Sequence, residues 1–238
     1  CSSDLQNPDV YFQGREAINP YTEAFPDHLS AAMAAFAQLT GRDYAPYIYS
    51  GHPEAERVLV LMGSGAETAA ATAQALIATG ERVGVLKVRL FRPLAADTLV
   101  AALPASTRRL AVLDRCKEPG SGGEPLYLDV VAAIAEHWPE RTDAADGSLP
   151  LVVGGRYGLA SREFTPAMVR AVFDNLAADR PRKHFSVGID DDVTHLSLPV
   201  QADWTISPGG DCFEALFYGL GSDGTVGANK NKIGRAHV

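Results

Sequence analysis

The sequence predicts an α/β fold built on a parallel, doubly wound sheet, and three observations support this. Short runs of β-branched and aliphatic residues alternate along the chain with longer stretches of helical periodicity. The strand candidates are apolar throughout, which is typical of strands covered by helices on both faces. Glycine and proline residues punctuate the boundaries between these stretches. Strands separated by helices in this way favour right-handed crossovers between parallel strands.

The individual elements follow in order through the middle of the chain. The stretch "RVLVLM" is expected to be the first buried strand, and the helix after it ends at Gly80. A second helix is expected between Pro93 and Pro104, and the last begins with Pro166 in its first turn. The expected strands are 57–62, 82–90, 109–115, 149–155 and 184–189, and the expected helices are 67–80, 95–103, 124–138 and 165–178.

Two segments are expected to lie outside this sheet. Residues 25–44 begin as a helix, with Asp27 as a candidate N-cap, and Gly41 ends it. Residues 140–149 are polar and rich in turn formers, which predicts a surface loop.

Composition narrows the class of protein. The net charge is −8 and 46% of the residues are hydrophobic, so neither nucleic acid nor an anionic membrane is an expected partner. No apolar run approaches the ~20 residues that span a bilayer. The three cysteines, Cys1, Cys116 and Cys212, are widely spaced and match neither a disulfide framework nor a metal site. A reducing cytoplasm is the expected compartment.

Two glycine-rich loops are candidate anion sites. "MGSGAET" follows the first strand, but Thr68 replaces the third glycine of the dinucleotide fingerprint, which favours a simple tight turn. "GLGSDG" does match G-x-G-x-x-G, with Gly219, Gly221 and Gly224, although the chain is too short to hold the confirming acidic residue ~20 positions later.

The residues after the second loop suit a phosphate group. Thr225 carries a hydroxyl, Lys230 carries a positive charge, and a helix beginning near Thr225 would add its N-terminal dipole. Asp223 argues against an anion unless it faces away or caps the helix. Anion binding and a structural turn between strand and helix both stay open.

Other reactive side chains favour structural roles. His52, His184 and His195 lie near carboxylates, but neither a G-x-S-x-G motif nor a cysteine–histidine pairing accompanies them. The stretch "IDDDVTH" matches no EF-hand loop and predicts a solvated turn or an ion-pair site between domains. Cys116 ends a strand, where a small apolar residue packs well.

A resemblance to a known family covers residues 6 to 231. The segments that carry it occur in order without a gap: "NPDVYFQGREAINPY", "RVLVLMGSGAET", "VGVLKVRLFRP", "AVLDRCKEPGSGGEPLYLDV", "GGRYGLASREFTPAMVRAVFDNL", "VGIDDDVTHLSLPV" and "YGLGSDGTVGANKN". The chain resembles an internal piece of pyruvate:ferredoxin (flavodoxin) oxidoreductase. One departure is Cys116, where relatives often carry threonine, which argues against a conserved thiol role.

The resemblance implies a division into domains. Residues 1–40 resemble the end of a first, pyrimidine-binding domain, and residues 41–212 resemble a second domain of the transketolase C-terminal-like type. Residues 213–231 resemble the start of a third domain, of the 2-oxoacid oxidoreductase gamma type. Residues 232–238, "KIGRAHV", look like a translated sequencing adapter and are excluded from fold reasoning.

The resemblance also implies the parent protein's chemistry. The family oxidatively decarboxylates pyruvate with coenzyme A, using thiamine diphosphate, magnesium and iron–sulfur clusters, and passes electrons to ferredoxin or flavodoxin. This piece carries neither the acidic residue that activates thiamine nor cysteine motifs for clusters, so we expect no cofactor in it and assign no catalytic or metal-binding residue. The expected partners are the remaining domains of the same polypeptide and a second copy in a homodimer.

The resemblance further assigns a role to the second glycine-rich loop. Coenzyme A is the family's one substrate with several phosphate groups and no site in the thiamine-binding domains. The residues expected to bind its phosphates are Gly221, Gly224, Thr225, Gly227, Asn229 and Lys230. Two other classes stay open: a stand-alone nucleotide- or CoA-binding module, and a purely structural swivel or dimerisation domain.

Overall fold

The computed structural model describes residues 7–144, 148–191, 193–207, 218–225 and 227. The chain divides into two compact units, Cys1–Trp204 and Thr205–Val238. The first unit contains all the helices and strands described below.

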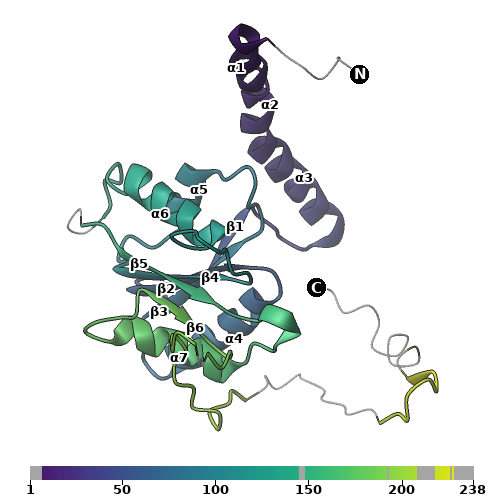
Figure 1. Cartoon of the computed structure of the whole chain (residues 1–238), viewed down its shortest axis with the longest axis vertical. Helices are drawn as coiled ribbons and strands as arrows, with labels where there is room; N and C mark the ends of the chain where they lie inside the picture. Colours follow the sequence, from purple (N-terminus) through teal and green to yellow (C-terminus); the bar gives the residue numbers. More distant parts are fainter. Residues whose placement is uncertain (1–6, 145–147, 192, 208–217, 226, 228–238) are drawn as a thin grey trace. The chain divides into compact units, whose positions relative to one another are not determined.

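A six-stranded mixed sheet forms the centre of the first unit (Figure 1). Its strands are β1 (Tyr47–Gly51), β2 (Arg57–Met62), β3 (Val83–Val88), β4 (Arg109–Asp114), β5 (Leu151–Arg156) and β6 (His184–Ser186), in the order β1-β3-β2-β4-β5-β6. All neighbours pair in parallel except β1, which pairs antiparallel with β3. In the sheet, β3 lies on one side of β2 and β4 lies on the other, so the strand order reverses between β2 and β4.

Helices cover both faces of the sheet, as Figure 1 shows. Helices α4 (Gly65–Ala78) and α7 (Pro166–Ala177) pack on one face, and α5 (Ala96–Ala101) and α6 (Pro125–His137) pack on the other. Each face has its own apolar cluster, because alternate residues of a strand point to opposite sides. Leu59 and Leu61 of β2 face α4 and α7, whereas Val58 and Val60 face α5 and α6. The predicted doubly wound α/β fold is confirmed.

Most predicted elements are confirmed within a few residues. The five expected strands are β2 to β6, and the expected helices in the sheet region are α4 to α7. Pro166 begins α7, and Gly41 ends α3 (Phe25–Thr40) in the left-handed conformation with φ 70°. A short 3-10 turn, Leu159–Ser161, precedes α7.

Two expectations about the first fifty residues need correction. Asp27 is not the N-cap of the helix, because α3 begins at Phe25 with Ala24 as its N-cap and Asp27 lies in its first turn. The expected strands also omit β1, whose five residues "YIYSG" lack the apolar run of the central strands. As an edge strand, β1 is only partly buried beyond Tyr47, so its sequence carries a weak strand signal.

The first forty residues form α1 (Pro8–Glu16), α2 (Asn19–Glu23) and α3, and none of the described residues in these helices is buried. Large apolar side chains are exposed on them, including Phe12, Tyr21 and Leu39. In the described part of the chain, no helix has the length and apolar character needed to cross a membrane.

Candidate functional site at the carboxyl edge of the sheet

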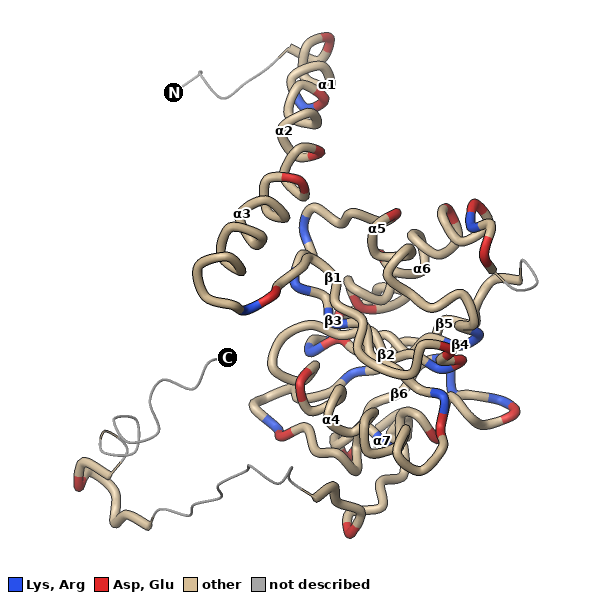
Figure 2. The backbone as a smooth tube through the Cα atoms, turned by 180° about the vertical axis from the view of Figure 1, so that it is seen from behind, with Lys and Arg blue, Asp and Glu red and all other residues tan. Residues whose placement is uncertain are grey.

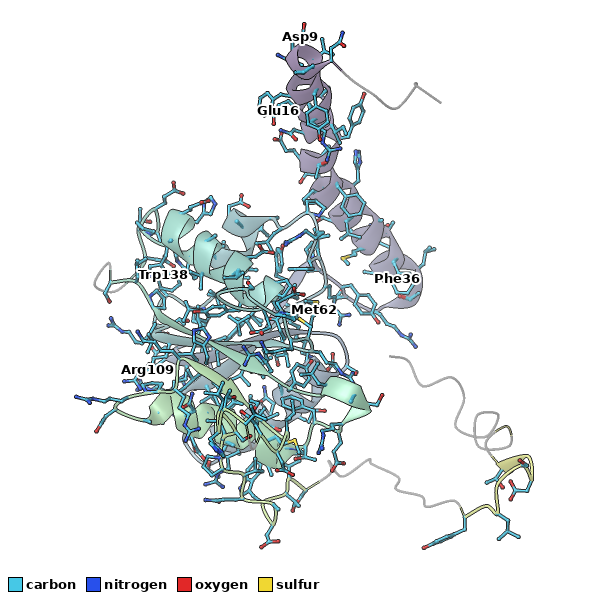
Figure 3. The ribbon with its side chains drawn as sticks, viewed as in Figure 1. Asp9, Glu16, Phe36, Met62, Arg109 and Trp138 are labelled. Atoms are coloured by element: carbon cyan, nitrogen blue, oxygen red, sulfur yellow. The ribbon has the colours of Figure 1, made fainter. Side chains whose placement is uncertain are left out.

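Parallel doubly wound sheets bind ligands where the strand order reverses, beyond the carboxyl ends of the strands. Here that point lies between β2 and β4, and the loops after these strands are Gly63–Ser64 and the glycine-rich stretch from Arg115 to Glu124. Met62, the last residue of β2, is labelled at this edge in Figure 3, and Arg109 is labelled at the opposite, amino edge.

Asp114 is the central acidic residue of this edge. It ends β4, is only 3% exposed, and accepts hydrogen bonds from the backbone N–H groups of Leu126 and Tyr127, each at 3.0 Å. These N–H groups belong to the first turn of α6 and have no partner within the helix. Asp114 therefore caps a helix that begins eleven residues further along the chain, at Pro125.

Burial is the main cause that raises the pKa of Asp114 above its usual value. The two backbone hydrogen bonds lower it, and the nearby carboxylates of Glu124 and Asp129 raise it again. A buried carboxylate with a raised pKa is a common feature of active sites, but it also occurs in structural networks. The partners of Asp114 decide between these two interpretations.

Glu124 and Arg156 form a buried ion pair beside Asp114. Glu124 is the N-cap residue of α6, yet its side chain makes no cap hydrogen bond, because Asp114 holds the helix N–H groups instead. Its carboxylate, 2% exposed, accepts a hydrogen bond of 2.6 Å from Nε of Arg156, the last residue of β5. The pair joins the loop after β4 to the strand beside it.

Two further contacts tie the loops after β2, β4 and β5 together. Arg115 donates from Nε to the carbonyl of Gly158 at 3.0 Å, and the Tyr157 hydroxyl donates to the carbonyl of Met62 at 3.3 Å. Tyr157 also lies against Gly65, where a methyl group would come 2.8 Å from its Oη. The principal polar groups of this edge are thus hydrogen-bonded to one another, which favours a rigid support over a reaction centre.

Cys116 lies beside this network and is half-buried. Burial raises the pKa of its thiol, and the carboxylates of Asp114, Glu124 and Glu118 raise it further. A thiol held in its protonated form is a poor nucleophile and a poor metal ligand. This agrees with the structural role predicted from the sequence.

The first glycine-rich loop forms the tight turn that the sequence favoured. Gly63 has φ +77°, and the backbone N–H groups of Ala66 and Glu67 bond to the carbonyls of Gly63 and Ser64. The close approach of Tyr157 gives Gly65 a packing reason as well.

The second glycine-rich loop is described only in part. Gly221 and Gly224 both have φ +80°, a conformation that favours glycine, and the backbone becomes helical at Thr225. Asn229 and Lys230 lie outside the described residues, and Gly227 is described as a helical residue. The structure therefore describes only part of the residues predicted to bind phosphate, and their role stays a prediction.

Asp223 fills the part of that loop that is described. Its carboxylate accepts hydrogen bonds from the backbone N–H groups of Leu220 at 2.8 Å and Thr225 at 3.0 Å. A hydrogen bond from the Thr225 side chain, followed by these backbone bonds, lowers the pKa of Asp223 to about 2. Asp223 caps the turn, which is one of the two arrangements expected to be compatible with a phosphate nearby.

Two of the three histidines and Asp191 of the acidic run have structural partners. His52 accepts a hydrogen bond at Nδ1 from the backbone of Glu54, and the His184 ring packs edge-on against Tyr127. Asp191 accepts hydrogen bonds from the backbone of Val193, Thr194 and Leu196, and its pKa is lowered mainly by the hydrogen bond from the Thr194 side chain. The described residues hold no group of three or more metal-ligating side chains.

The network of Asp114, Glu124 and Arg156 was not singled out from the sequence. A signal was present, because Asp114 and Arg156 are charged residues at the last positions of two apolar strands. Charged residues that end neighbouring parallel strands meet at one edge of the sheet.

Comparisons with known proteins agree with the sequence resemblance. Residues 55–155 match the family model described as "Pyruvate:ferredoxin oxidoreductase core domain II". The chain is 58% identical over 96% of its length to pyruvate-flavodoxin oxidoreductase of Trichormus variabilis, of which it covers 19%. It is 56% identical over 96% of its length to pyruvate:ferredoxin oxidoreductase of Moorella thermoacetica, again covering 19%. The chain thus spans about a fifth of the length of these relatives.

A more distant similarity is found among solved structures. A chain of 2-oxoglutarate:ferredoxin oxidoreductase from Magnetococcus marinus aligns with 55% of this chain and 20% of its own length, at 20% identity and a TM-score of 0.37.

Proposed function

We propose that this chain, which by its sequence belongs to the pyruvate:ferredoxin (flavodoxin) oxidoreductases, is an inactive structural piece of an enzyme that converts pyruvate and coenzyme A to acetyl-CoA and CO₂. The parent enzyme would pass the electrons to ferredoxin or flavodoxin. The observation that supports this most directly is the 58% identity to a pyruvate-flavodoxin oxidoreductase across 96% of the chain.

The chain's own contribution would be support between domains. The carboxyl edge, where related folds bind ligands, is occupied by the side-chain network of Asp114, Glu124 and Arg156. Thiamine diphosphate, magnesium and iron–sulfur clusters would supply carbanion and electron-transfer chemistry elsewhere in the parent. The described residues of this chain do not match the ligand sets of these groups, so we derive no step through them.

The domain limits follow from the resemblance. Residues 1–40 would end the first domain, 41–212 would form the second, 213–231 would begin the third, and 232–238 would be adapter-derived. The matched residues 55–155 fall inside the proposed second domain. The exposed apolar side chains of α1 to α3 support placing them against a part of the parent that lies outside this chain.

The parent would be a cytoplasmic homodimer that contacts neither nucleic acid nor membrane. The net charge of −8 supports the expectation that it binds neither nucleic acid nor an anionic membrane, and the wide spacing of the cysteines supports a reducing compartment.

Activity measurements test the main proposal. The purified 238-residue chain should be colourless and should not reduce a viologen dye with pyruvate and coenzyme A, whereas the full-length gene product, purified anaerobically, should do so. Turnover by the short chain would contradict the structural role, and a full-length protein active only on another 2-oxoacid would contradict the assignment to pyruvate.

For the second glycine-rich loop, we retain the proposal that Gly221, Gly224, Thr225, Gly227, Asn229 and Lys230 bind the phosphates of coenzyme A in the parent enzyme. The positive φ of Gly221 and Gly224 and the helical backbone from Thr225 support it. Asp223 accepts from the N–H of Thr225 and so caps the turn, which is an arrangement expected to tolerate a phosphate nearby.

Kinetics of the parent enzyme test this loop. Lys230→Ala should raise the KM for coenzyme A about ten-fold or more, because a charge-assisted hydrogen bond is lost. Reduction of the clusters by pyruvate without coenzyme A serves as the internal control and should not change. An unchanged KM together with lower thermal stability would make the loop a structural turn.

A further inference from the structure

Only one nitrogen of the Arg109 guanidinium group, Nη1, donates hydrogen bonds to other described residues. Arg109 begins β4, at the amino edge of the sheet (Figure 3). Its Nη1 donates to the carbonyls of Leu176 at 2.5 Å and Ala178 at 2.7 Å, which lie at the carboxyl end of α7 and lack helical partners. A guanidinium group has five N–H donors, so Nε and Nη2 keep three. Within the described residues, these three donors have no partner.

Arg141 shows what the same arrangement does elsewhere in this protein. Its Nη1 donates to the carbonyls of Val100 and Leu103, both at 2.8 Å, where α5 ends. Its Nε and Nη2 then bind the two carboxylate oxygens of Asp143, at 2.9 and 2.8 Å. One edge of the guanidinium group caps a helix and the other edge holds an oxyanion in the two-pronged geometry that arginine favours.

Arg109 is one of the residues that line a cavity. Its volume is about 410 Å³, and it is lined by Glu56, Arg57, Arg108, Arg109, Leu176 and Ala177. Sites for small molecules typically have volumes of about 300–1,000 Å³. The cavity is therefore of a size for a small ligand.

The charges around the cavity favour an anion. Three arginines and one glutamate contribute to its lining, and Arg82 approaches that glutamate, Glu56, at 3.8 Å. Arg108 has a hydrogen bond of its own, to Ser148 at 3.2 Å, so the positive charge available to an anion is assigned to Arg109 alone. Arg57 donates to Glu81 at 2.9 Å, which offsets one of the positive charges. The carboxyl end of α7 is itself unfavourable to an anion, but Arg109 already compensates two of its carbonyls. Figure 2 shows Lys, Arg, Asp and Glu interspersed over the rest of this unit.

We propose that the Nε–Nη2 edge of Arg109 binds an oxyanion, the carboxylate or phosphate group of a small molecule, in the cavity between the amino ends of β2 and β4 and the carboxyl end of α7. Asp143 on Arg141 is the internal model for this contact. The proposal is independent of the coenzyme A loop and of the reaction assigned to the parent.

Anion titrations of the 238-residue chain test the proposal. Phosphate and malonate are added separately, against sodium chloride at equal ionic strength, and both the melting temperature and the ¹⁵Nε resonance of Arg109 are followed. At least one of the two anions should raise the melting temperature saturably and shift the Arg109 resonance. The anion that does so identifies the phosphate or the carboxylate as the preferred group.

Two matched variants separate this site from general charge effects. Arg109→Lys keeps the positive charge but removes the pair of donors that allows bidentate binding, so it should weaken anion binding about ten-fold or more. Arg141→Lys removes an edge that is already filled by Asp143, and it should leave anion affinity unchanged. No saturable response, no shift of the Arg109 resonance, or equal weakening in both variants would overturn the proposal. If a variant folds poorly, the response of the Arg109 ¹⁵Nε resonance in the unmodified chain still tests the proposal.

Discussion

Asp114 and Asp223 make the same kind of contact in two regions of the molecule, yet their pKa values move in opposite directions. Each accepts hydrogen bonds from two backbone N–H groups: those of Leu126 and Tyr127 in the first turn of α6 for Asp114, and those of Leu220 and Thr225 for Asp223. Burial raises the pKa of Asp114, whereas hydrogen bonds, first from the Thr225 side chain, lower the pKa of exposed Asp223 to about 2. Similar hydrogen bonds therefore accompany opposite pKa shifts, because Asp114 is shielded from solvent and Asp223 is exposed to it.

The two regions also differ in how far the cap reaches. Asp223 bonds to residues three and two positions away, so its turn is a local structure. Asp114 bonds to residues twelve and thirteen positions away and joins β4 to α6. We therefore expect loss of the buried, long-range Asp114 cap to lower the stability of the fold more than loss of the exposed, local Asp223 cap.

The largest effect is expected from the ion pair that flanks Asp114. Arg156→Ala would leave the carboxylate of Glu124 buried without its cation, and breaking such pairs costs about 3–5 kcal/mol of unfolding free energy. Urea unfolding followed by circular dichroism measures this. Arg170→Ala, which removes a more exposed pair with Asp174 at 3.7 Å, is the control and should cost less. Equal losses would show that burial does not set the strength of these pairs.

A smaller loss is expected when the long-range cap itself is removed. Asp114→Ala leaves the N–H groups of Leu126 and Tyr127 without their acceptor. The free energy of unfolding should fall by about 1–3 kcal/mol, which is the cost of an unsatisfied buried group. Relief of the repulsion from Glu124 offsets part of this cost. The same unfolding experiment measures the difference, and hydrogen exchange at the two amides should accelerate. Unchanged exchange would mean that the cap is dispensable.

The pH dependence of the two carboxylates should have opposite signs. Since the pKa of folded Asp114 is raised, its contribution to stability is greatest below the unfolded value of about 3.8 and falls as the pH rises through that value toward the folded pKa. For Asp223, the contribution is present above about 3.8 and is lost as the pH falls toward about 2. Carbon-13 NMR of the two carboxyl groups between pH 2 and 7 gives both midpoints. A midpoint for Asp114 below that of Asp223 would contradict the comparison.

The smallest effect is expected for the exposed cap. Asp223→Ala should not measurably change the unfolding of the unit Cys1–Trp204, because the turn lies in the other compact unit of the chain. The backbone amides of Leu220 and Thr225 should instead shift in the NMR spectrum, since they lose their acceptor. A global loss as large as that of Asp114→Ala would show that the two units unfold together.

Local signals in the sequence were sufficient for most of the fold. Apolar runs located the central strands, helical periodicity located α4 to α7, and Gly41 and Pro166 marked helix ends where the structure has them. These signals succeed because each depends on backbone preferences within a few residues. The edge strand β1 was missed because it is paired on one side only and lacks a continuous apolar run.

Only the tertiary structure revealed the side-chain network at the carboxyl edge and the donors of Arg109 that lack a partner among the described residues. Asp114, rather than the N-cap residue Glu124, caps α6, and this choice requires β4 and α6 to lie at hydrogen-bonding distance. Arg109 and Arg141 make the same helix contacts, but only Arg141 has an aspartate two positions away to fill its other edge. Periodicity and composition encode which segments form and which faces they bury. The partner of each charged side chain is decided by which strand and helix ends the packing brings together, and those ends lie far apart in the sequence.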